Sequence, residues 1–192
     1  MNRLPILLIM LTLTAGCATS VPATHHYLLT GPEADPAAAE DSISLTLAGV
    51  STAAYLQTQG IVILTTETEV ATAQRHRWAE PLPEQLRRRI PAQLGRALPR
   101  VRVFTQHAPS TGPRLFVHFD RFNGHFDGVA VIGGTWHLEN ERGELLLRRH
   151  FTTRQPLDND GYPALVSALS TATTALIGDI AESLAPVLID GR

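Results

Sequence analysis

The sequence predicts an α+β domain in which two main helices pack on a largely antiparallel sheet. Three observations indicate this class. Several short runs alternate apolar and polar residues, two longer stretches repeat apolar residues every three or four positions, and strand-like runs precede each helical stretch. The chain has 192 residues and a single cysteine, so one domain of this length has to bury its core without a disulfide.

The first seventeen residues resemble a bacterial lipoprotein signal. Arg3 precedes an apolar run over residues 4–13, and two small residues lead into Cys17. That run is much shorter than the roughly 20 residues that a bilayer span needs, so it fits a cleaved signal. We therefore expect residues 1–16 to be removed, Cys17 to carry lipid, and residues 17–24, which are small and polar, to form a lipidated tether.

Residues 25–188 form the predicted domain, which opens with strands. Residues 26–29 read as a short strand, and the loose stretch 31–41 is rich in Pro and Ala. The first clear alternation follows, with Ile43, Leu45 and Leu47 on one face, as expected for a half-buried strand. Two further β-rich runs, residues 61–66 and 69–78, predict paired strands.

The first helix is predicted over residues 82–98. Its apolar residues fall every four positions and form one stripe: Leu82, Leu86, Ile90, Leu94 and Leu98. Pro83 fits a first helical turn, whereas Pro91 removes a backbone hydrogen bond and predicts a kink or break. Pro99 ends the element, and residues 100–106 read as a strand.

An antiparallel meander is predicted over residues 113–154. Its strands span residues 114–124, 129–139 and 144–153, separated by turns at Asp127-Gly128 and Arg142-Gly143.

The second helix is predicted over residues 163–188, where apolar residues recur every three or four positions. Asp158 and Asp160 are the expected capping residues before Pro163. Because Asp179 and Glu182 interrupt this stretch, we expect no membrane span after the signal, and the N-terminal lipid is the expected membrane anchor.

Composition and motifs argue against several functions. The net charge of −2 gives no reason to expect nucleic acid as a partner. The sequence has no Gly-x-Ser-x-Gly elbow, no His-Glu-x-x-His helix and no phosphate-binding Gly-Lys loop, so we expect neither an enzyme nor a cofactor. His118 and Asp120 share a strand face, but their spacing fixes no third ligand, so no metal site is expected.

Several blocks together resemble a known family. They are His26-Tyr27-Leu28-Leu29, Tyr55-Leu56 before Gly60-Ile61-Val62, Arg77-Trp78-Ala79-Glu80-Pro81-Leu82, Arg121-Phe122 and Trp136-His137-Leu138. In this order, and with the apolar C-terminal helix, they resemble the PqiC-like (YmbA-like) ABC-type transport auxiliary lipoproteins. The resemblance implies an outer-membrane lipoprotein on the periplasmic face, a docking subunit for an MCE-domain (PqiB-like) protein in intermembrane lipid transport. It leaves a homo-oligomer open.

The candidate partner-binding residues are Tyr55, Leu56, Trp78, Arg87 and Arg88. Each has a structural alternative: the tryptophan as core, the tyrosine and leucine as a lid on the core, and the arginines as the solvated face of an amphipathic helix. The alternative function is a structural or assembly lipoprotein of the cell envelope without a role in lipid transport.

Overall fold

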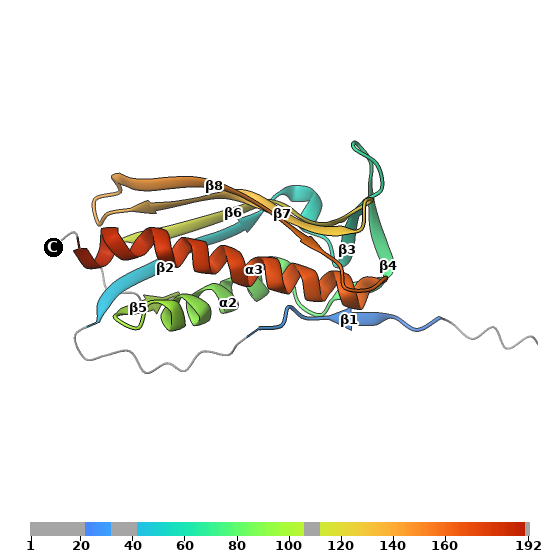
Figure 1. Ribbon diagram of the computed structural model, residues 1–192, viewed down its shortest axis with the longest axis horizontal. Helices are drawn as coiled ribbons and strands as arrows, with labels where there is room; N and C mark the ends of the chain where they lie inside the picture. The colour runs from blue at the N-terminus through green and yellow to red at the C-terminus, as the bar shows by residue number, and fades with distance from the viewer. Residues whose placement is uncertain (1–21, 32–41, 106–111, 191–192) are drawn as a thin grey trace, which may run out of the picture.

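The computed structural model describes residues 22–31, 42–105 and 112–190 (Figure 1). The predicted signal, Cys17 and most of the tether lie outside these residues. The elements, in chain order, are β1 (His25–Tyr27), β2 (Ile43–Thr52), the 3-10 turn η2 (Ala54–Leu56), β3 (Gly60–Leu64), β4 (Val70–Trp78), α2 (Leu82–Ala97), β5 (Val101–Phe104), β6 (Arg114–His125), β7 (Val129–Glu139), β8 (Leu145–Pro156), α3 (Tyr162–Ala185) and the π-helical turn η3 (Pro186–Asp190).

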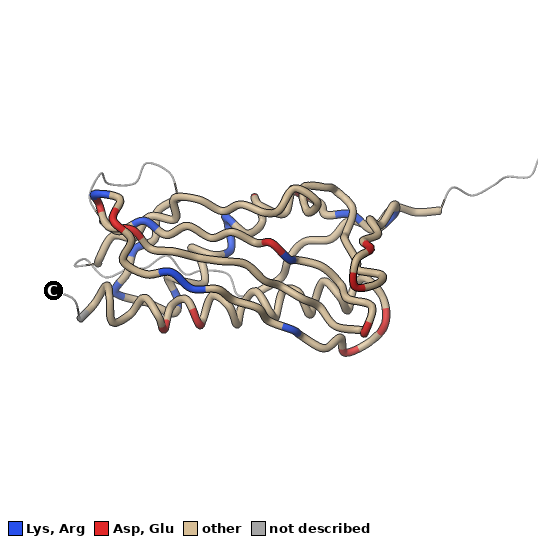
Figure 2. The backbone as a smooth tube through the Cα atoms, turned by 90° about the horizontal axis from the view of Figure 1, so that it is seen from above, with Lys and Arg blue, Asp and Glu red and all other residues tan. Residues whose placement is uncertain are grey.

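The described strands form one eight-stranded sheet, and helices α2 and α3 lie together on one of its faces (Figure 1). Three antiparallel pairings, β3 with β4, β6 with β7, and β7 with β8, hold most of the paired residues. The other four pairings are parallel. The expected α+β class is confirmed, with a sheet that is mixed in detail. Figure 2 shows charged positions of both signs dispersed along the chain.

Strand β6 is the centre of this sheet. One of its edges pairs with β7 along the whole strand. The other edge is divided, because β2 pairs in parallel with residues Arg114 to Phe119 and β3 pairs in parallel with Gly124 and His125. On the edge that faces β7, the register of β6 shifts between Phe119 and Arg121, in the stretch of β6 that lies between these two parts. The sheet therefore forks, with β2 and β5 on one branch and β3, β4 and β1 on the other.

The predicted apolar stripe of α2 is buried. Leu82, Leu86, Ile90 and Leu94 are at most 1% exposed and pack in the core. The helix runs unbroken through Pro91, so a break there is wrong, and a kink there stays a prediction. Proline costs one backbone hydrogen bond in a helix interior, and we attribute the continuity to the buried residues on both sides of it, whose burial outweighs that cost.

Helix α3 supplies the largest part of the helical layer. Its N-cap is Gly161, with φ of 96° and no side-chain cap, so the expected capping by Asp158 or Asp160 is wrong. Glycine adopts this left-handed backbone without steric cost, which lets the chain turn into the helix without a capping side chain.

The helical stretch Tyr162–Ile189 is long and apolar enough to cross a membrane. By length and composition, the expectation that no stretch after the signal could span a membrane is therefore wrong. Within the fold, 61% of the most apolar 18-residue part of this stretch is buried. Leu169, Leu176 and Ile180, for example, pack in the hydrophobic core. The helix therefore serves as a core helix of the described fold.

Both predicted turns of the meander are confirmed. Gly128 and Gly143 have φ of 80° and 82° and connect β6 to β7 and β7 to β8. These values lie in the left-handed region that favours glycine.

Candidate functional site

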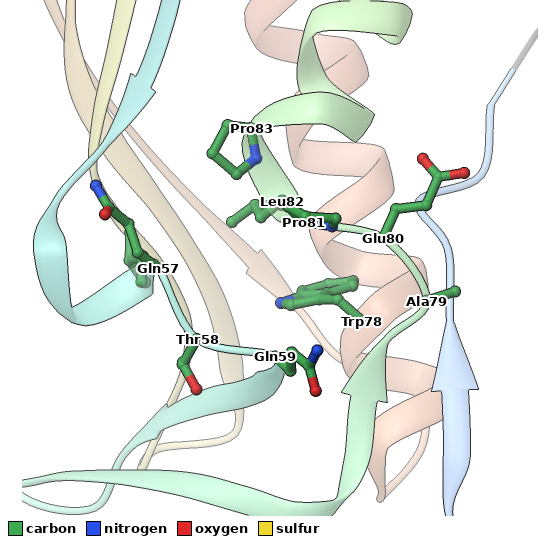
Figure 3. Close-up of a pocket in the computed structure, with 10 residues that line it drawn as sticks. Gln57, Thr58, Gln59, Trp78, Ala79, Glu80, Pro81, Leu82 and Pro83 are labelled. Atoms are coloured by element: carbon green, nitrogen blue, oxygen red, sulfur yellow. The ribbon is translucent and has the colours of Figure 1, made fainter.

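A pocket of about 290 Å³ lies where two connections of the chain meet, one between η2 and β3 and the other between β4 and α2 (Figure 3). Its lining residues are Leu56, Gln57, Thr58, Gln59, Trp78, Ala79, Glu80, Pro81, Leu82 and Pro83. Apolar side chains form most of this lining, and Glu80 is its one ionisable residue. A pocket of this kind suits an apolar group held between polar rim residues.

Trp78 forms one wall of the pocket from the end of β4 (Figure 3). Its side chain is 5% exposed and meets Phe122 edge-to-face, with ring centroids 6.2 Å apart. Its backbone N–H donates to the carbonyl of Gln59 at 2.7 Å, which ties the two connections together. The next N–H, of Ala79, donates to the carbonyl of Tyr27 at 2.8 Å. Trp78 is therefore both a core residue and a fixed wall of the pocket.

Gln85 holds the beginning of α2 in place beside the pocket. Its side chain is 1% exposed. Its Oε1 accepts a hydrogen bond from the N–H of Leu29 at 2.8 Å, and its Nε2 donates to the carbonyl of Glu80 at 2.9 Å. One buried amide thus satisfies backbone groups of the chain leaving β1 and of the connection that lines the pocket, which rigidifies this side of the site.

Tyr55 and Leu56 occupy neighbouring positions with different surroundings. Leu56 is buried and lines the pocket. Tyr55 is 39% exposed, and its hydroxyl donates to the carbonyl of Asp120 on β6 at 2.9 Å. Burial raises the pKa of Tyr55, the carboxylate of Asp120 raises it further, and Arg121 opposes both. The tyrosine therefore stays protonated and fixes η2 to the sheet beside the pocket.

The two candidate arginines of α2 pair with nearby carboxylates. Arg88 donates from Nη1 to Oε2 of Glu80 at 2.8 Å, so it reaches the pocket rim through a lining residue. Arg87 lies 3.6 Å from Glu84, one turn earlier on the helix. Both pairs are largely exposed, and such pairs add little to stability.

The structure thus brings Leu56 and Trp78 together in one pocket, with Tyr55 beside it and Arg88 at its rim, while Arg87 lies off it. Sequence reasoning missed Gln85, because a glutamine in a helix reads as solvent-facing. The available signal was its position three residues after Leu82, next to the apolar stripe.

Histidines and acidic residues gather on the sheet without forming a ligand set. His118 Nδ1 lies 2.9 Å from Ser51 Oγ, and His125 Nδ1 lies 2.6 Å from Asp127. Among residues 22–31, 42–105 and 112–190, no group of three or more His, Cys, Asp or Glu side chains is placed to hold a metal ion.

An α+β body with a mostly apolar pocket is typical of a binding domain. The model of the ABC-type transport auxiliary lipoprotein component family matches residues 27–181. The chain belongs to this family. It is a family of transport auxiliary lipoproteins and not a family of enzymes. The chain is accordingly a membrane-associated lipoprotein of the cell envelope.

Two curated relatives agree with this assignment. The chain is 29% identical over 172 residues to the intermembrane transport lipoprotein PqiC of Escherichia coli K12, covering 88% of this chain and 91% of that one. The match to PqiC of Shigella flexneri has the same identity and coverage.

Solved structures share the fold. A crystal structure of an uncharacterized protein matches with a TM-score of 0.75 and 29% identity, covering 85% of this chain and 99% of that one. The protein XCC0632 of Xanthomonas campestris matches with a TM-score of 0.70 and 20% identity, over 87% and 96% of the two chains.

Proposed function

We propose that this protein is an outer-membrane lipoprotein, anchored through Cys17 on the periplasmic face, that docks an MCE-domain (PqiB-like) protein in intermembrane lipid transport. The observation that carries the proposal is the family match over residues 27–181, together with relatives named as intermembrane transport lipoproteins. In this role residues 1–16 are the cleaved signal and residues 17–24 the tether.

The docking contact in this proposal is the pocket beside Trp78. Its walls are held by backbone hydrogen bonds of Trp78 and Ala79 and by the buried amide of Gln85, so little ordering is needed when a partner binds. An apolar side chain of leucine or phenylalanine size gains about 1.5–3 kcal/mol on burial.

That gain gives weak affinity by itself. Anchoring through the tether confines the domain to one surface, and confinement raises the effective concentration of a partner that reaches the same surface. A single modest pocket can therefore serve a docking subunit.

The substitution Thr58→Arg tests the pocket. Thr58 is a half-buried lining residue, so a long cationic side chain there fills or charges the pocket. Thr171→Arg is the matched control, since it makes the same change on the exposed face of α3, away from the pocket. We expect the PqiB-like protein of the same cell, co-expressed with the full lipidated chain, to co-purify with the wild type and the control and at least about tenfold less with Thr58→Arg, the loss that corresponds to about 1.4 kcal/mol.

Two outcomes contradict the proposal. Absence of the MCE-domain protein from the wild-type preparation overturns its role as partner and favours a structural or assembly lipoprotein. Equal recovery with Thr58→Arg and Thr171→Arg removes the pocket from the contact. Thermal unfolding of both variants checks that the domain remains folded.

A further inference from the structure

Strand β8 has an open edge. It pairs with β7 through the register Val129↔Pro156 to Glu139↔Leu145, and within the part of the chain that the structure describes no strand pairs with its other side. The strand is twelve residues long and lies at the margin of the sheet (Figure 1). A free edge of this length presents a row of backbone donors and acceptors that can pair with another strand.

The edge strand is basic. It carries Arg148, Arg149 and Arg154 and contains no Asp or Glu. Arg154 pairs with Asp127. Arg148 and Arg149 have no carboxylate partner among the described residues, and the guanidinium of Arg149 donates instead to the carbonyl of Arg148 at 3.2 Å. Unlike Arg87 and Arg88 of α2, these two arginines have no carboxylate within the described part of the chain that neutralises their charge locally.

The two arginines lie on opposite faces of the sheet. Arg148 stands opposite His137, and Arg149 stands opposite Trp136, which is buried. Neighbouring residues of a strand point to opposite faces. A strand added to β8 would therefore meet one cation on each face, so carboxylates on both faces of that strand would find a partner.

Charge argues against a second copy of this chain on this edge. An antiparallel β8–β8 pairing brings arginine-rich strands together. The edge strand β5 contains Arg102 and begins directly after Arg100, so it is basic too. Like charges placed opposite one another destabilise a strand pair. The edge strand β1 carries His25 and His26, which supply no negative charge either.

An anionic surface also fits this edge poorly. Phosphate groups accept hydrogen bonds but cannot donate to the carbonyls that alternate with N–H groups along a strand edge. An extended peptide satisfies both, with main-chain hydrogen bonds supplying affinity and side chains supplying specificity.

We propose that the open edge of β8 binds an extended, acidic segment of a partner protein by strand addition, with carboxylates of that segment pairing with Arg148 and Arg149. This surface is separate from the pocket beside Trp78 and does not depend on an MCE-domain partner.

A displayed library of random dodecapeptides, selected on the purified full chain, tests the proposal. We expect the enriched peptides to carry Asp or Glu among β-branched residues. A synthetic peptide of the most enriched sequence should slow hydrogen exchange in residues 145–156. Methylation of alternate backbone nitrogens in that peptide should abolish binding, because it removes the N–H donors that strand pairing needs.

Charge reversal provides the matched comparison. The double variant Arg148→Glu/Arg149→Glu should lower the affinity for the selected peptide about tenfold or more, because it turns attractive charge pairs into repulsive ones. The double variant Arg100→Glu/Arg102→Glu makes the same charge change at the edge strand β5 and should bind as the wild type does.

Four results overturn the proposal: no enrichment from the library, enriched peptides without acidic residues, exchange protection outside β8, and equal binding by the two double variants. Crosslinking of β8 to a second copy would instead make the edge a self-association surface. Binding of vesicles that contain phosphatidylglycerol, lost on reversal of Arg148 and Arg149, would make it a membrane contact.

Discussion

Gln85 and Gln93 are two buried glutamines on the same helix, and we expect replacement by leucine to destabilise the protein at Gln85 but not at Gln93. Gln85→Leu removes two hydrogen bonds to backbone groups, the N–H of Leu29 and the carbonyl of Glu80. A buried backbone group left without a partner costs about 1–3 kcal/mol. The bond from Leu29 is buried, whereas the bond to Glu80 is partly exposed, so water can replace the second.

The expected net loss in the free energy of unfolding is about 2 kcal/mol for Gln85→Leu, after the added apolar burial of leucine offsets part of the cost. For a domain of this size that loss lowers Tm by about 4–8 °C. Gln93 differs, because its Nε2 donates to Thr174 over a long 3.4 Å and its buried Oε1 has no partner. Gln93→Leu relieves that unpaired oxygen and should be neutral or stabilising.

Urea denaturation followed by circular dichroism measures both variants against the wild type. The two substitutions are chemically identical and lie on one helix, so helix propensity cancels in the comparison. Hydrogen exchange of the Leu29 amide gives a local readout and should speed up only in Gln85→Leu. The reasoning is refuted if both variants shift the free energy of unfolding equally, or if Gln85→Leu leaves it unchanged.

Three further predictions concern backbone space, pH and the anchor. Gly95→Ala should raise the free energy of unfolding by about 0.5–1 kcal/mol, since a Cβ there meets no other atom and alanine favours helix. Gly134→Ala should prevent folding, measured as loss of soluble protein, because its Cβ would overlap the carbonyl oxygen of His118. Burial, a nearby histidine and an arginine lower the pKa of His76 below its usual 6.5, so the folded state should lose stability as the pH falls below 6.5 through the lowered pKa. The urea midpoint should therefore change less between pH 7.5 and pH 5 in His76→Gln than in the wild type, and an equal change in both would contradict this. Cys17→Ser should release the protein from the membrane fraction, and an intact mass showing an unmodified Cys17 in the wild type would refute lipidation.

The elements of this fold were predictable because their patterns are local. The alternation at Ile43, Leu45 and Leu47 and the four-residue spacing from Leu82 to Leu94 each require only neighbours along the chain, and each places its residues on the buried face observed. The meander turns were equally visible, because Gly128 and Gly143 carry the positive φ that their positions require.

The pairing of distant strands was not predictable in the same way. The alternation of apolar and polar residues in β2 does not predict that β2 lies parallel to β6, or that one edge of β6 is shared between β2 and β3. The pocket depends on this arrangement. Leu56 and Trp78 were singled out separately from the sequence, and only the folded topology brings their two connections together.

The divided edge of β6 has a consequence for how the chain acquires its structure. Strands β2 and β3 both pair with β6, which is synthesised about fifty or more residues after them. Contacts between such distant segments must overcome the entropy of closing a long loop. The first half of the chain is thus an incomplete template with no central strand. We expect this domain to assemble late and all at once, when β6 arrives to join both branches, so a fragment ending at Phe104 should remain unstructured.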